Sequence, residues 1–238
     1  MAPMKSPVAI VTGAGRGIGR ATALELAGYG YQVVLVARTE SDLAQTAGLL
    51  GANAALTVAA DLSRPADIER AIAAAMDRFG RIDALINNAG YAPVATLEQT
   101  TPEEWQKVLD INLTAPFLLT SAVWPVFKKG GGGVIVNVTS VAARDPFPTL
   151  AAYGATKAAL NLLTLAAARE GQPLGIRVHA VAPAATETGM FRSLMSEEQF
   201  PRDRTLDPAD VARVIVQCVC GDLRYSSGEV IYMHRTVK

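Results

Sequence analysis

The sequence predicts an α/β fold in which a doubly wound parallel sheet carries helices on both faces. Short apolar runs alternate regularly with longer helical patterns rich in Ala and Leu, as expected of successive βα units. The apolar runs are continuous rather than alternating with polar residues, which is typical of parallel strands buried on both faces. With 238 residues, 50% of them hydrophobic, the chain can bury a sizeable core. We therefore expect one domain over residues 1–238.

The expected elements follow one another along the whole chain. Strands are predicted at 7–12, 32–37, 54–60, 82–87, 133–139, 175–181 and 228–233. Helices are predicted at 17–28, 40–50, 65–79, 102–128, 152–170 and 208–220. Three of these helices have proline at the first helical position, which is a common start signal. A strand pattern directly follows the glycines at 130–133, so we expect a tight turn there rather than a linker.

The composition argues against several classes of function. Lys and Arg total 22 and Asp and Glu total 22, so no basic excess points to nucleic acid or to an anionic membrane surface. The apolar runs are too short for a membrane span or for a signal peptide, which predicts a cytoplasmic protein. Cys218 and Cys220 have no His or further Cys nearby, so we expect two packed thiols and neither a disulfide framework nor a metal site.

A glycine-rich segment, TGAGRGIG at 12–19, joins the first predicted strand to the first helix. Glycines let the backbone approach a phosphate closely, and a helix N-terminus supplies unpaired N–H groups and a positive dipole. The segment therefore suits a dinucleotide pyrophosphate. Gly13, Gly17 and Gly19 form a G-x-x-x-G-x-G pattern, which differs from the G-x-G-x-x-G fingerprint. Taken alone, the segment is also compatible with a turn that binds nothing.

Two arginines bear on the choice of cofactor. Arg38 lies 19 residues after Gly19, close to the position where a carboxylate would bind a ribose 2′-hydroxyl or an arginine a 2′-phosphate. Arg16, within the glycine segment, adds a second guanidinium that suits the same phosphate. This pair favours NADP(H) over NAD(H). The alternative is that both are solvated surface arginines, with Arg38 neutralised by Glu40.

Three further segments come at or after the carboxyl ends of predicted strands, where open parallel sheets bind ligands. They are NNAG at 87–90, NVTS at 137–140 and YGATK at 153–157. Tyr153 and Lys157 are four residues apart and so share one face of a helix. Such a pair alone is common on helix surfaces, but its combination with the other segments indicates a functional site.

In their joint order, these motifs resemble those of the short-chain dehydrogenase/reductase superfamily, and most of all the bacterial 3-oxoacyl-acyl-carrier-protein reductases. The resemblance covers nearly the whole chain, from TGAGRGIG through Asp61-Leu62, NNAG, INLTAP, VTS and YGATK to VAPAATET. It implies a Rossmann-type fold, NADP(H) as cofactor, a small carbonyl or alcohol substrate, and a homodimer or homotetramer. Acyl thioesters, small ketones, quinones and steroid-like compounds all stay open as substrates.

The resemblance also implies roles for individual residues. A catalytic tetrad would consist of Asn112, Ser140, Tyr153 and Lys157. The cofactor would be held by Gly13, Gly15, Arg16, Gly17, Ile18, Gly19, Arg38, Asp61, Leu62, Asn88, Ala89, Gly90, Tyr153, Lys157, Pro183, Thr186 and Thr188. Because a free phenol titrates near pH 10, Tyr153 needs tuning to exchange protons, and the Lys157 cation is expected to lower its pKa. Ser140 would donate a hydrogen bond to the substrate oxygen, and Asn112 would orient a water.

The chain departs from the family pattern at three places. His179 stands where relatives commonly have Asn, Ala184 where they have Gly, and His234-Arg235 where they end in DGG. We expect His179 to be a strand histidine hydrogen-bonded in the core, and Ala184 to bring a methyl group close to the nicotinamide position.

The segment 188–206 corresponds to a substrate lid. It carries Met190, Phe191, Leu194, Met195 and Phe200 together with Arg192, Arg202 and Arg204. This composition suits an apolar carbonyl compound, with an acidic group as a further option. The alternative is an amphipathic helix whose apolar stripe packs on the core.

The sequence thus predicts an NADP(H)-dependent oxidoreductase that transfers a hydride between nicotinamide and a carbonyl or alcohol, with tyrosine as general acid and base. Two alternatives are kept. One is an NAD-linked alcohol dehydrogenase, which Arg38 disfavours; the other is a non-catalytic NADP(H)-binding sensor, which the complete tetrad disfavours and Ala184 keeps open.

Overall fold

Seven parallel strands form one sheet in the computed structural model, which describes residues 6–51 and 54–235. The strands are β1 (Val8–Thr12), β2 (Gln32–Ala37), β3 (Ala55–Ala59), β4 (Ala84–Asn87), β5 (Gly133–Val138), β6 (Ile176–Pro183) and β7 (Val230–Met233). Their order across the sheet is β3-β2-β1-β4-β5-β6-β7. The ends of the expected 1–238 domain lie outside the described residues.

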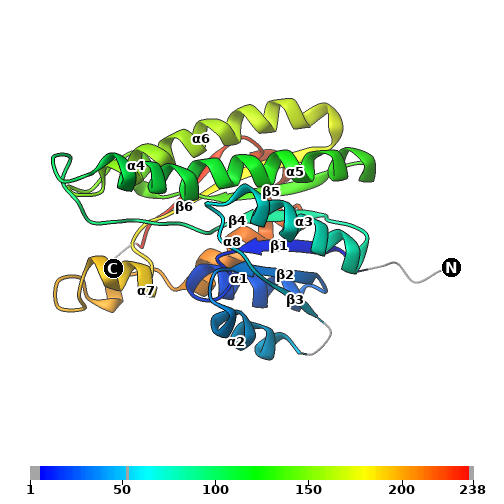
Figure 1. Ribbon diagram of the computed structural model, residues 1–238, viewed down its shortest axis with the longest axis horizontal. Coiled ribbons are helices and arrows are strands. Elements are labelled where there is room, and N and C mark those ends of the chain that lie inside the picture. Colours follow the sequence, from blue (N-terminus) through cyan, green and yellow to red (C-terminus); the bar gives the residue numbers. More distant parts are fainter. Residues whose placement is uncertain (1–5, 52–53, 236–238) are drawn as a thin grey trace.

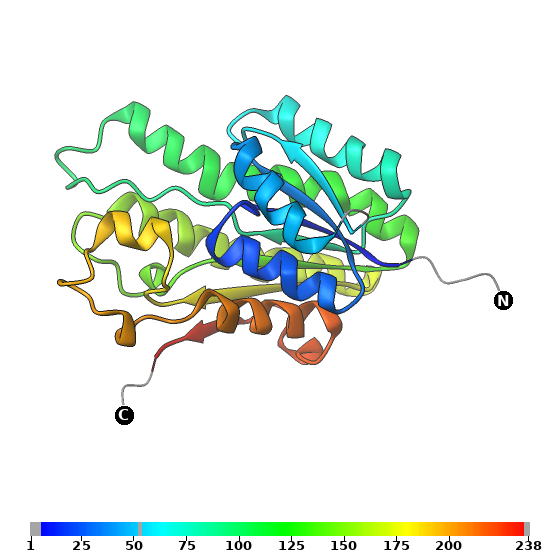
Figure 2. The ribbon, with the colours of Figure 1, turned by 90° about the horizontal axis from the view of Figure 1, so that it is seen from below.

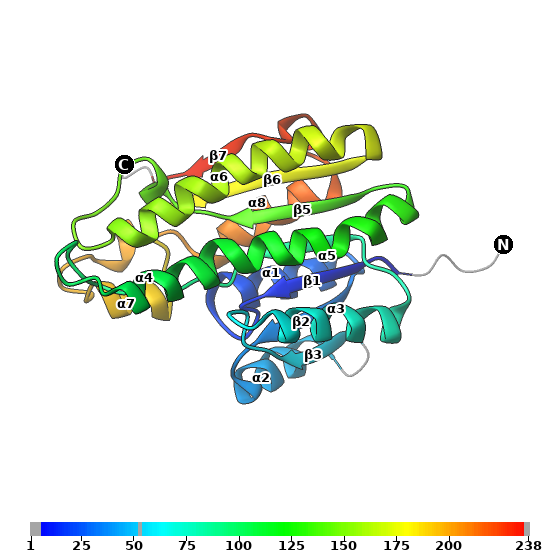
Figure 3. The same ribbon diagram turned by 45° about the horizontal axis from the view of Figure 1, so that its top comes forward.

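Helices cover both faces of this sheet, so the predicted fold class is confirmed (Figures 1 and 3). One face carries α1 (Gly17–Gly28), α2 (Glu40–Leu50) and α8 (Pro208–Cys220). The other carries α3 (Pro65–Phe79), α5 (Ala115–Gly130) and α6 (Ala151–Gly171). Each layer has its own apolar core, because the strand residues alternate between the two faces of the sheet. For example, Ile10 packs under one layer and its neighbour Val11 under the other.

The predicted helix at 102–128 is wrong as a single α-helix. The structure has α4 (Pro102–Leu109), a π-helical segment Asp110–Thr114, and then α5. Pro116 has no N–H with which to bond the carbonyl of residue 112, so the regular α-helical ladder is interrupted there. The bounds predicted for α1, α2, α3 and α8 are confirmed, and most remaining bounds differ by one or two residues at an end.

Two local predictions have different outcomes. The glycines at 130–133 do form a tight turn, since α5 ends at Gly130, Gly131 has φ +83° and β5 begins at Gly133. The expectation of two packed thiols is wrong for one of them, because Cys218 is buried and Cys220 is exposed. Residues two apart on a helix point in nearly opposite directions, so the two thiols of α8 cannot share one environment.

The chain reverses its direction of winding at β1, which lies between β2 and β4. The loops that follow β1 and β4 therefore diverge at the carboxyl edge of the sheet and leave a crevice between them. The short helix α7 (Gly189–Leu194) lies beyond the same edge (Figures 1 and 2). Within the described ranges, none of the helices has the length and hydropathy needed to cross a membrane.

Candidate active site

A single cleft runs along the carboxyl edge of the sheet, between the loop after β1 and α7. All but two of the residues predicted for the site line this cleft. The exceptions are Gly19 and Asn112, which are buried. The order of the elements thus brings segments that are far apart in the sequence to one edge.

The glycine-rich loop is held close to the segment after β4. Gly13 has φ +65°, and a Cβ atom there would lie 2.8 Å from Nδ2 of Asn88. A Cβ atom on Gly19 would collide with the carbonyl oxygen of Gly13. Within residues 6–51, the N-terminus of α1 has neither a side-chain cap from Arg16 nor an acidic residue in its first turn. Its N–H groups are thus available to an anion, which fits the phosphates of a dinucleotide.

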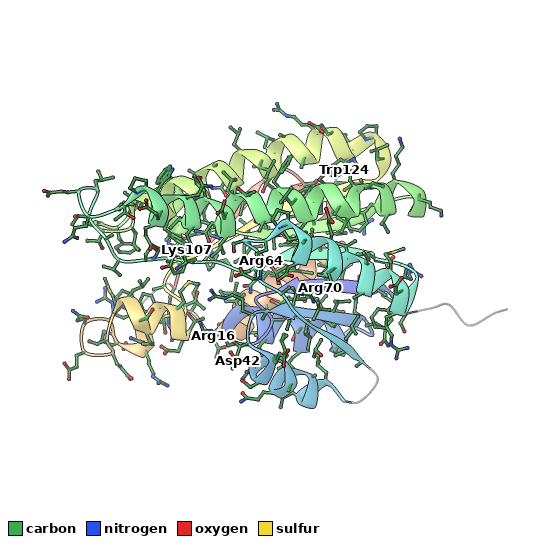
Figure 4. All side chains as sticks on the ribbon, viewed as in Figure 1. Arg16, Asp42, Arg64, Arg70, Lys107 and Trp124 are labelled. Carbon is green, nitrogen blue, oxygen red and sulfur yellow. The ribbon has the colours of Figure 1, made fainter. Side chains whose placement is uncertain are left out.

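Arg16 and Arg38 both line the cleft and are exposed. Neither side chain forms a hydrogen bond or an ion pair with any residue that the structure describes, so Glu40 does not neutralise Arg38 by direct contact. Figure 4 shows Arg16 and Asp42 near the ends of α1 and α2 that face this edge. Asp42 was not predicted as a cleft residue, because an acidic residue in the first turn of a helix is common for dipole reasons alone.

Thr12, another residue that sequence reasoning missed, fixes the segment after β4. Its hydroxyl donates to the carbonyl of Ile86 over 3.2 Å and accepts from the N–H groups of Asn88 and Ala89 over 2.9 and 3.0 Å. The Asn88 side-chain amide donates to the carbonyl of Thr12 over 2.8 Å. The Asn88 side chain therefore links the ends of β1 and β4. These hydrogen bonds hold the backbone of the segment in place where Ala89 and Gly90 line the cleft.

Asp61 and Leu62 follow β3 at the end of the cleft that contains the glycine-rich loop. The Asp61 carboxylate accepts hydrogen bonds from the backbone N–H of Ser63 over 3.1 Å and from its hydroxyl over 2.8 Å. Burial acts to raise the pKa of Asp61, but these hydrogen bonds and the charges of Arg38 and Arg64 lower it overall. Asp61 is therefore ionised at neutral pH.

Ser140, Tyr153 and Lys157 meet in the middle of the cleft. Ser140 follows β5 and hydrogen-bonds Tyr153, which lies near the start of α6. Lys157, one turn further along α6, has its Nζ 5.6 Å from the centroid of the Tyr153 ring and donates to the carbonyl of Val138 over 2.8 Å. The helix spacing and the end of β5 together place a hydroxyl, a phenol and an ammonium group side by side.

Burial dominates the pKa values of this cluster. It raises the pKa of Tyr153, although the Ser140 hydrogen bond acts in the opposite direction. It also lowers the pKa of Lys157 to about 8. The net shift of the Tyr153 pKa is thus opposite to the one expected from the Lys157 cation, because desolvation of the phenolate dominates it. In this structure the phenol is held protonated.

Asn112 lies in the π-helical segment and is 0% exposed. Its Oδ1 accepts from the N–H of Tyr91 and its Nδ2 donates to the carbonyl of the same residue, each over 2.8 Å. Nδ2 also approaches the hydroxyl of Thr156 at 3.3 Å. The side chain thus clamps the backbone of Tyr91. A water oriented by Asn112 would therefore have to bind the backbone carbonyl of Asn112. In a regular α-helix this carbonyl accepts from the N–H of the residue four positions on, which Pro116 lacks.

Pro183, Thr186 and Thr188 lead from β6 to α7 along the cleft. The Thr186 hydroxyl donates to the carbonyl of Ala184 over 2.9 Å, and the Thr188 hydroxyl caps α7 by accepting from the N–H of Phe191 over 3.1 Å. Thr149 is the sole non-glycine residue with positive φ among those described, so the backbone of Ala184 is unstrained.

The alternative for the segment 188–206, an amphipathic helix packed on the core, does not hold for its helix α7. No residue of the described helix α7 is buried, and its Met190, Phe191 and Leu194 line the cleft instead. His179, in contrast, is a core histidine as predicted. It is 0% exposed on β6, with Nδ1 3.3 Å from the hydroxyl of Ser226.

Comparison with known proteins identifies the family. The family model described as short chain dehydrogenase matches residues 7–199. The chain belongs to the short chain dehydrogenase family. It is therefore an oxidoreductase, and the family membership predicted from the motifs is confirmed. In the part of the chain that the structure describes, no group of three or more His, Cys, Asp or Glu side chains is placed to hold a metal ion.

Individual short chain dehydrogenases are similar over almost the whole chain. A 3-oxoacyl-[acyl-carrier-protein] reductase of Synechocystis is 38% identical over 221 residues, which are 90% of each chain. The crystal structure of the 3-ketoacyl-(acyl-carrier-protein) reductase of Brucella melitensis, complexed with NADH, has a TM-score of 0.90 at 36% identity and covers 96% of this chain and 97% of its own. The structure of levodione reductase has a TM-score of 0.89 at 29% identity and covers 96% of both chains.

Proposed function

We propose that this protein is an NADP(H)-dependent oxidoreductase that reduces a carbonyl compound, with Tyr153 as the general acid. The observation that carries the proposal is the cluster of Ser140, Tyr153 and Lys157 in the cleft that also contains the glycine-rich loop. A nicotinamide cofactor, when bound, supplies the hydride. A nearby protein group must then protonate the substrate oxygen.

The residues of the cluster have complementary tasks. Ser140 donates a hydrogen bond that fixes the substrate oxygen beside Tyr153. The Tyr153 phenol, which burial keeps protonated, donates its proton to that oxygen. Lys157 holds the site through the carbonyl of Val138 and offers its remaining N–H donors to the cofactor ribose. A protonated tyrosine suits reduction, so we favour this direction over that of an NAD-linked alcohol dehydrogenase.

The dinucleotide end of the cleft supports NADP(H). Gly13, Gly15, Gly17, Ile18 and Gly19 shape the phosphate loop at the uncapped start of α1. Arg16 and Arg38 are exposed cations with no ionic partner among the described residues, so both are free to pair with a 2′-phosphate. Asp61, Leu62, Asn88, Ala89 and Gly90 would flank the adenosine and ribose, with Pro183, Thr186 and Thr188 at the nicotinamide end. The NADH in the Brucella relative shows that a similar protein accepts a nicotinamide dinucleotide.

The wider organisation of the protein is part of the same proposal. We propose one dinucleotide-binding domain with a substrate lid at 188–206, acting on a small molecule in the cytoplasm as a homodimer or homotetramer. Sedimentation of the purified protein tests the assembly.

Replacing Tyr153 with Phe tests the function. The ring volume is kept and one hydroxyl is lost, so Tyr153→Phe should fold and bind NADPH like the wild type. NADPH oxidation with a reducible ketone should fall by about 10²-fold or more, the usual contribution of general acid catalysis. Undiminished turnover in this variant would refute the role of Tyr153. If the wild type binds NADPH firmly but reduces no carbonyl in a broad panel, the non-catalytic sensor becomes the better interpretation.

A further inference from the structure

The part of the cleft beyond Tyr153, which we call the substrate wall, is built almost entirely from apolar side chains. Three segments supply its lining residues: 91, 92 and 94 after β4; 141, 142 and 147–150 after β5; and 190, 191, 194 and 195 of the lid. Val94, Phe147, Leu150, Phe191, Leu194 and Met195 are representative. These segments come from separate loops, so their shared apolar character is a property of the folded cleft.

The charged groups of the cleft lie elsewhere. Among the described residues that line it, the charged side chains are those of Arg16, Arg38, Asp42, Asp61 and Lys157. The first four belong to the dinucleotide end. Lys157 stands at the reacting centre, where it already donates to the carbonyl of Val138. The substrate wall therefore offers no cation to an anionic substrate.

The arginines of the lid do not change this conclusion, because they have other partners. Arg192 pairs with Glu187 at 2.5 Å and donates to the carbonyl of Phe200 over 2.7 Å. Arg202 pairs with Glu197 at 3.1 Å, and the guanidinium carbon of Arg204 lies 4.9 Å from the centroid of the Phe200 ring. None of the three lines the cleft within the described chain. The lid arginines stabilise the lid itself, so the option of an acidic group on the substrate loses its support.

The apolar surface of the wall reaches the reacting centre at Met190. A Cβ atom built on Gly90 would lie 3.8 Å from Cε of Met190 and 3.9 Å from Nζ of Lys157, so the Met190 methyl group and the ammonium group face the same point. The one large polar group of the wall, the hydroxyl of Tyr91, accepts from Lys107 over 3.2 Å. Methionine is flexible and adapts to ligands of different shape.

We infer that the substrate is a neutral, hydrophobic ketone, and that carbonyl compounds carrying a carboxylate or phosphate on the part that enters the substrate wall are excluded. An anion that entered the wall would lose its hydration without gaining a cation or a set of N–H donors, which is strongly unfavourable. This inference rests on the proposed function and adds to it the class of substrate.

A matched pair of substrates tests the inference. Methyl 5-oxohexanoate and the 5-oxohexanoate anion present the same ketone and differ in the charge at the far end. With saturating NADPH, we expect kcat/KM for the ester to exceed that for the acid by about 100-fold or more. Equal values for the two substrates would overturn the inference while leaving the proposed reductase intact. If neither is reduced, and no other ketone of a broad panel is reduced although NADPH binds, the proposed function fails, and the inference fails with it.

A charged variant provides the converse experiment. Val94 lines the wall and is 57% exposed, so an arginine there can be accommodated at the mouth of the cleft. Val94→Arg should raise the ratio of kcat/KM for the acid to that for the ester by about tenfold or more. Val94→Gln, of similar length but uncharged, should leave the ratio near that of the wild type. A ratio that changes equally in both variants would show that charge does not govern the selection.

Discussion

At the scale of single residues, Lys157 is a buried cation whose position serves the site rather than stability. Burial lowers its pKa to about 8 from 10.5. Keeping it charged at pH 7 therefore costs up to about 3 kcal/mol, of which its hydrogen bond to Val138 returns about 1. Replacing this residue with methionine removes both contributions. We expect Lys157→Met to be more stable than the wild type by about 2 kcal/mol at pH 7, with most of its activity lost.

The dependence on pH provides the control for that prediction. Below pH 8 the lysine is protonated in both the folded and unfolded states, so the wild type bears the whole cost. Between pH 8 and 10.5 the unfolded state binds more protons than the folded state, so the stability of the wild type rises with pH. Thermal unfolding should therefore show a gap between variant and wild type that narrows above pH 8. A variant less stable than the wild type at pH 7 would contradict the assignment.

His179 should make the protein sensitive to acid. Desolvation, together with the nearby Arg177 charge, lowers the pKa of His179 to about 4 from 6.5, although the contact with Ser226 acts in the opposite direction. Its Nε2 has no hydrogen-bond partner among the described residues. The neutral form of His179 therefore contributes up to about 3 kcal/mol to the free energy of unfolding. This contribution is fully present above pH 6.5 and is lost as the pH falls through 4.

His179→Asn tests this dependence, since asparagine keeps a polar group but does not titrate. Melting temperatures measured between pH 7.5 and 4.5 should fall less steeply for the variant than for the wild type. Parallel curves for the two proteins would mean that other groups govern the acid response.

The sequence predicted which residues line the cleft better than it predicted the hydrogen bonds that they form. The spacing of Tyr153 and Lys157 is a local property of a helix, so the sequence could predict that they meet. The clamp of Asn112 on Tyr91 joins residues that are 21 positions apart, and its geometry depends on the π-helical segment. Thr12 and Asp42 were missed because neither residue type is unusual where it occurs.

At the scale of elements, the segment 188–206, the proposed lid, is held by one ion-pair network. Glu187 accepts from Arg192 through both carboxylate oxygens, over 2.9 and 2.5 Å, and from the Thr205 hydroxyl over 3.2 Å. Glu187→Gln would lose the charge while keeping the shape. We expect the KM for a ketone to rise about fivefold, because a looser lid positions Met190 and Phe191 less well.

The same variant should keep its global melting temperature within a few degrees, because the pair is partly exposed and such pairs contribute little. Limited proteolysis within 195–204 should be faster than in the wild type. Glu197→Gln, which removes the more exposed pair with Arg202, is the matched control and should leave KM near that of the wild type. A similar rise in KM in both variants would show that the network does not position the lid.

Elements differed in how well the sequence predicted them. Proline at the first helical position sets the starts of α3, α4 and α8, and the start and end of α3 and α8 were both predicted correctly. The π-helical segment and the short helix α7 were not predicted. The missing N–H of Pro116 accounts for the first and the Thr188 cap marks the start of the second, but these local signals do not by themselves fix the type and length of the segment.

At the scale of the whole molecule, the order of the strands brings the loop after β1, the start of α6 and the helix α7 to one edge of the sheet (Figure 1). The continuous apolar runs and the alternation of strands and helices were enough to predict this layered arrangement. A dinucleotide bound along the edge would contact elements from both halves of the fold. Binding should therefore stabilise the molecule as a whole, which gives a prediction about cofactor choice.

That prediction compares the two cofactors by thermal unfolding. A ligand present at 100 times its Kd stabilises the folded state by about 2.7 kcal/mol, equivalent to roughly 5–10 °C for a chain of this size. If Arg16 and Arg38 bind the 2′-phosphate, the Kd for NADPH should be at least about tenfold lower than that for NADH, a difference of about 1.4 kcal/mol or more. At equal concentrations, NADPH should raise the melting temperature several degrees further than NADH. Arg38→Asp should reverse the order, whereas Arg64→Asp, a change of the same charge outside the cleft lining, should preserve it. Equal shifts for the two cofactors in the wild type would show that the arginines do not select between them.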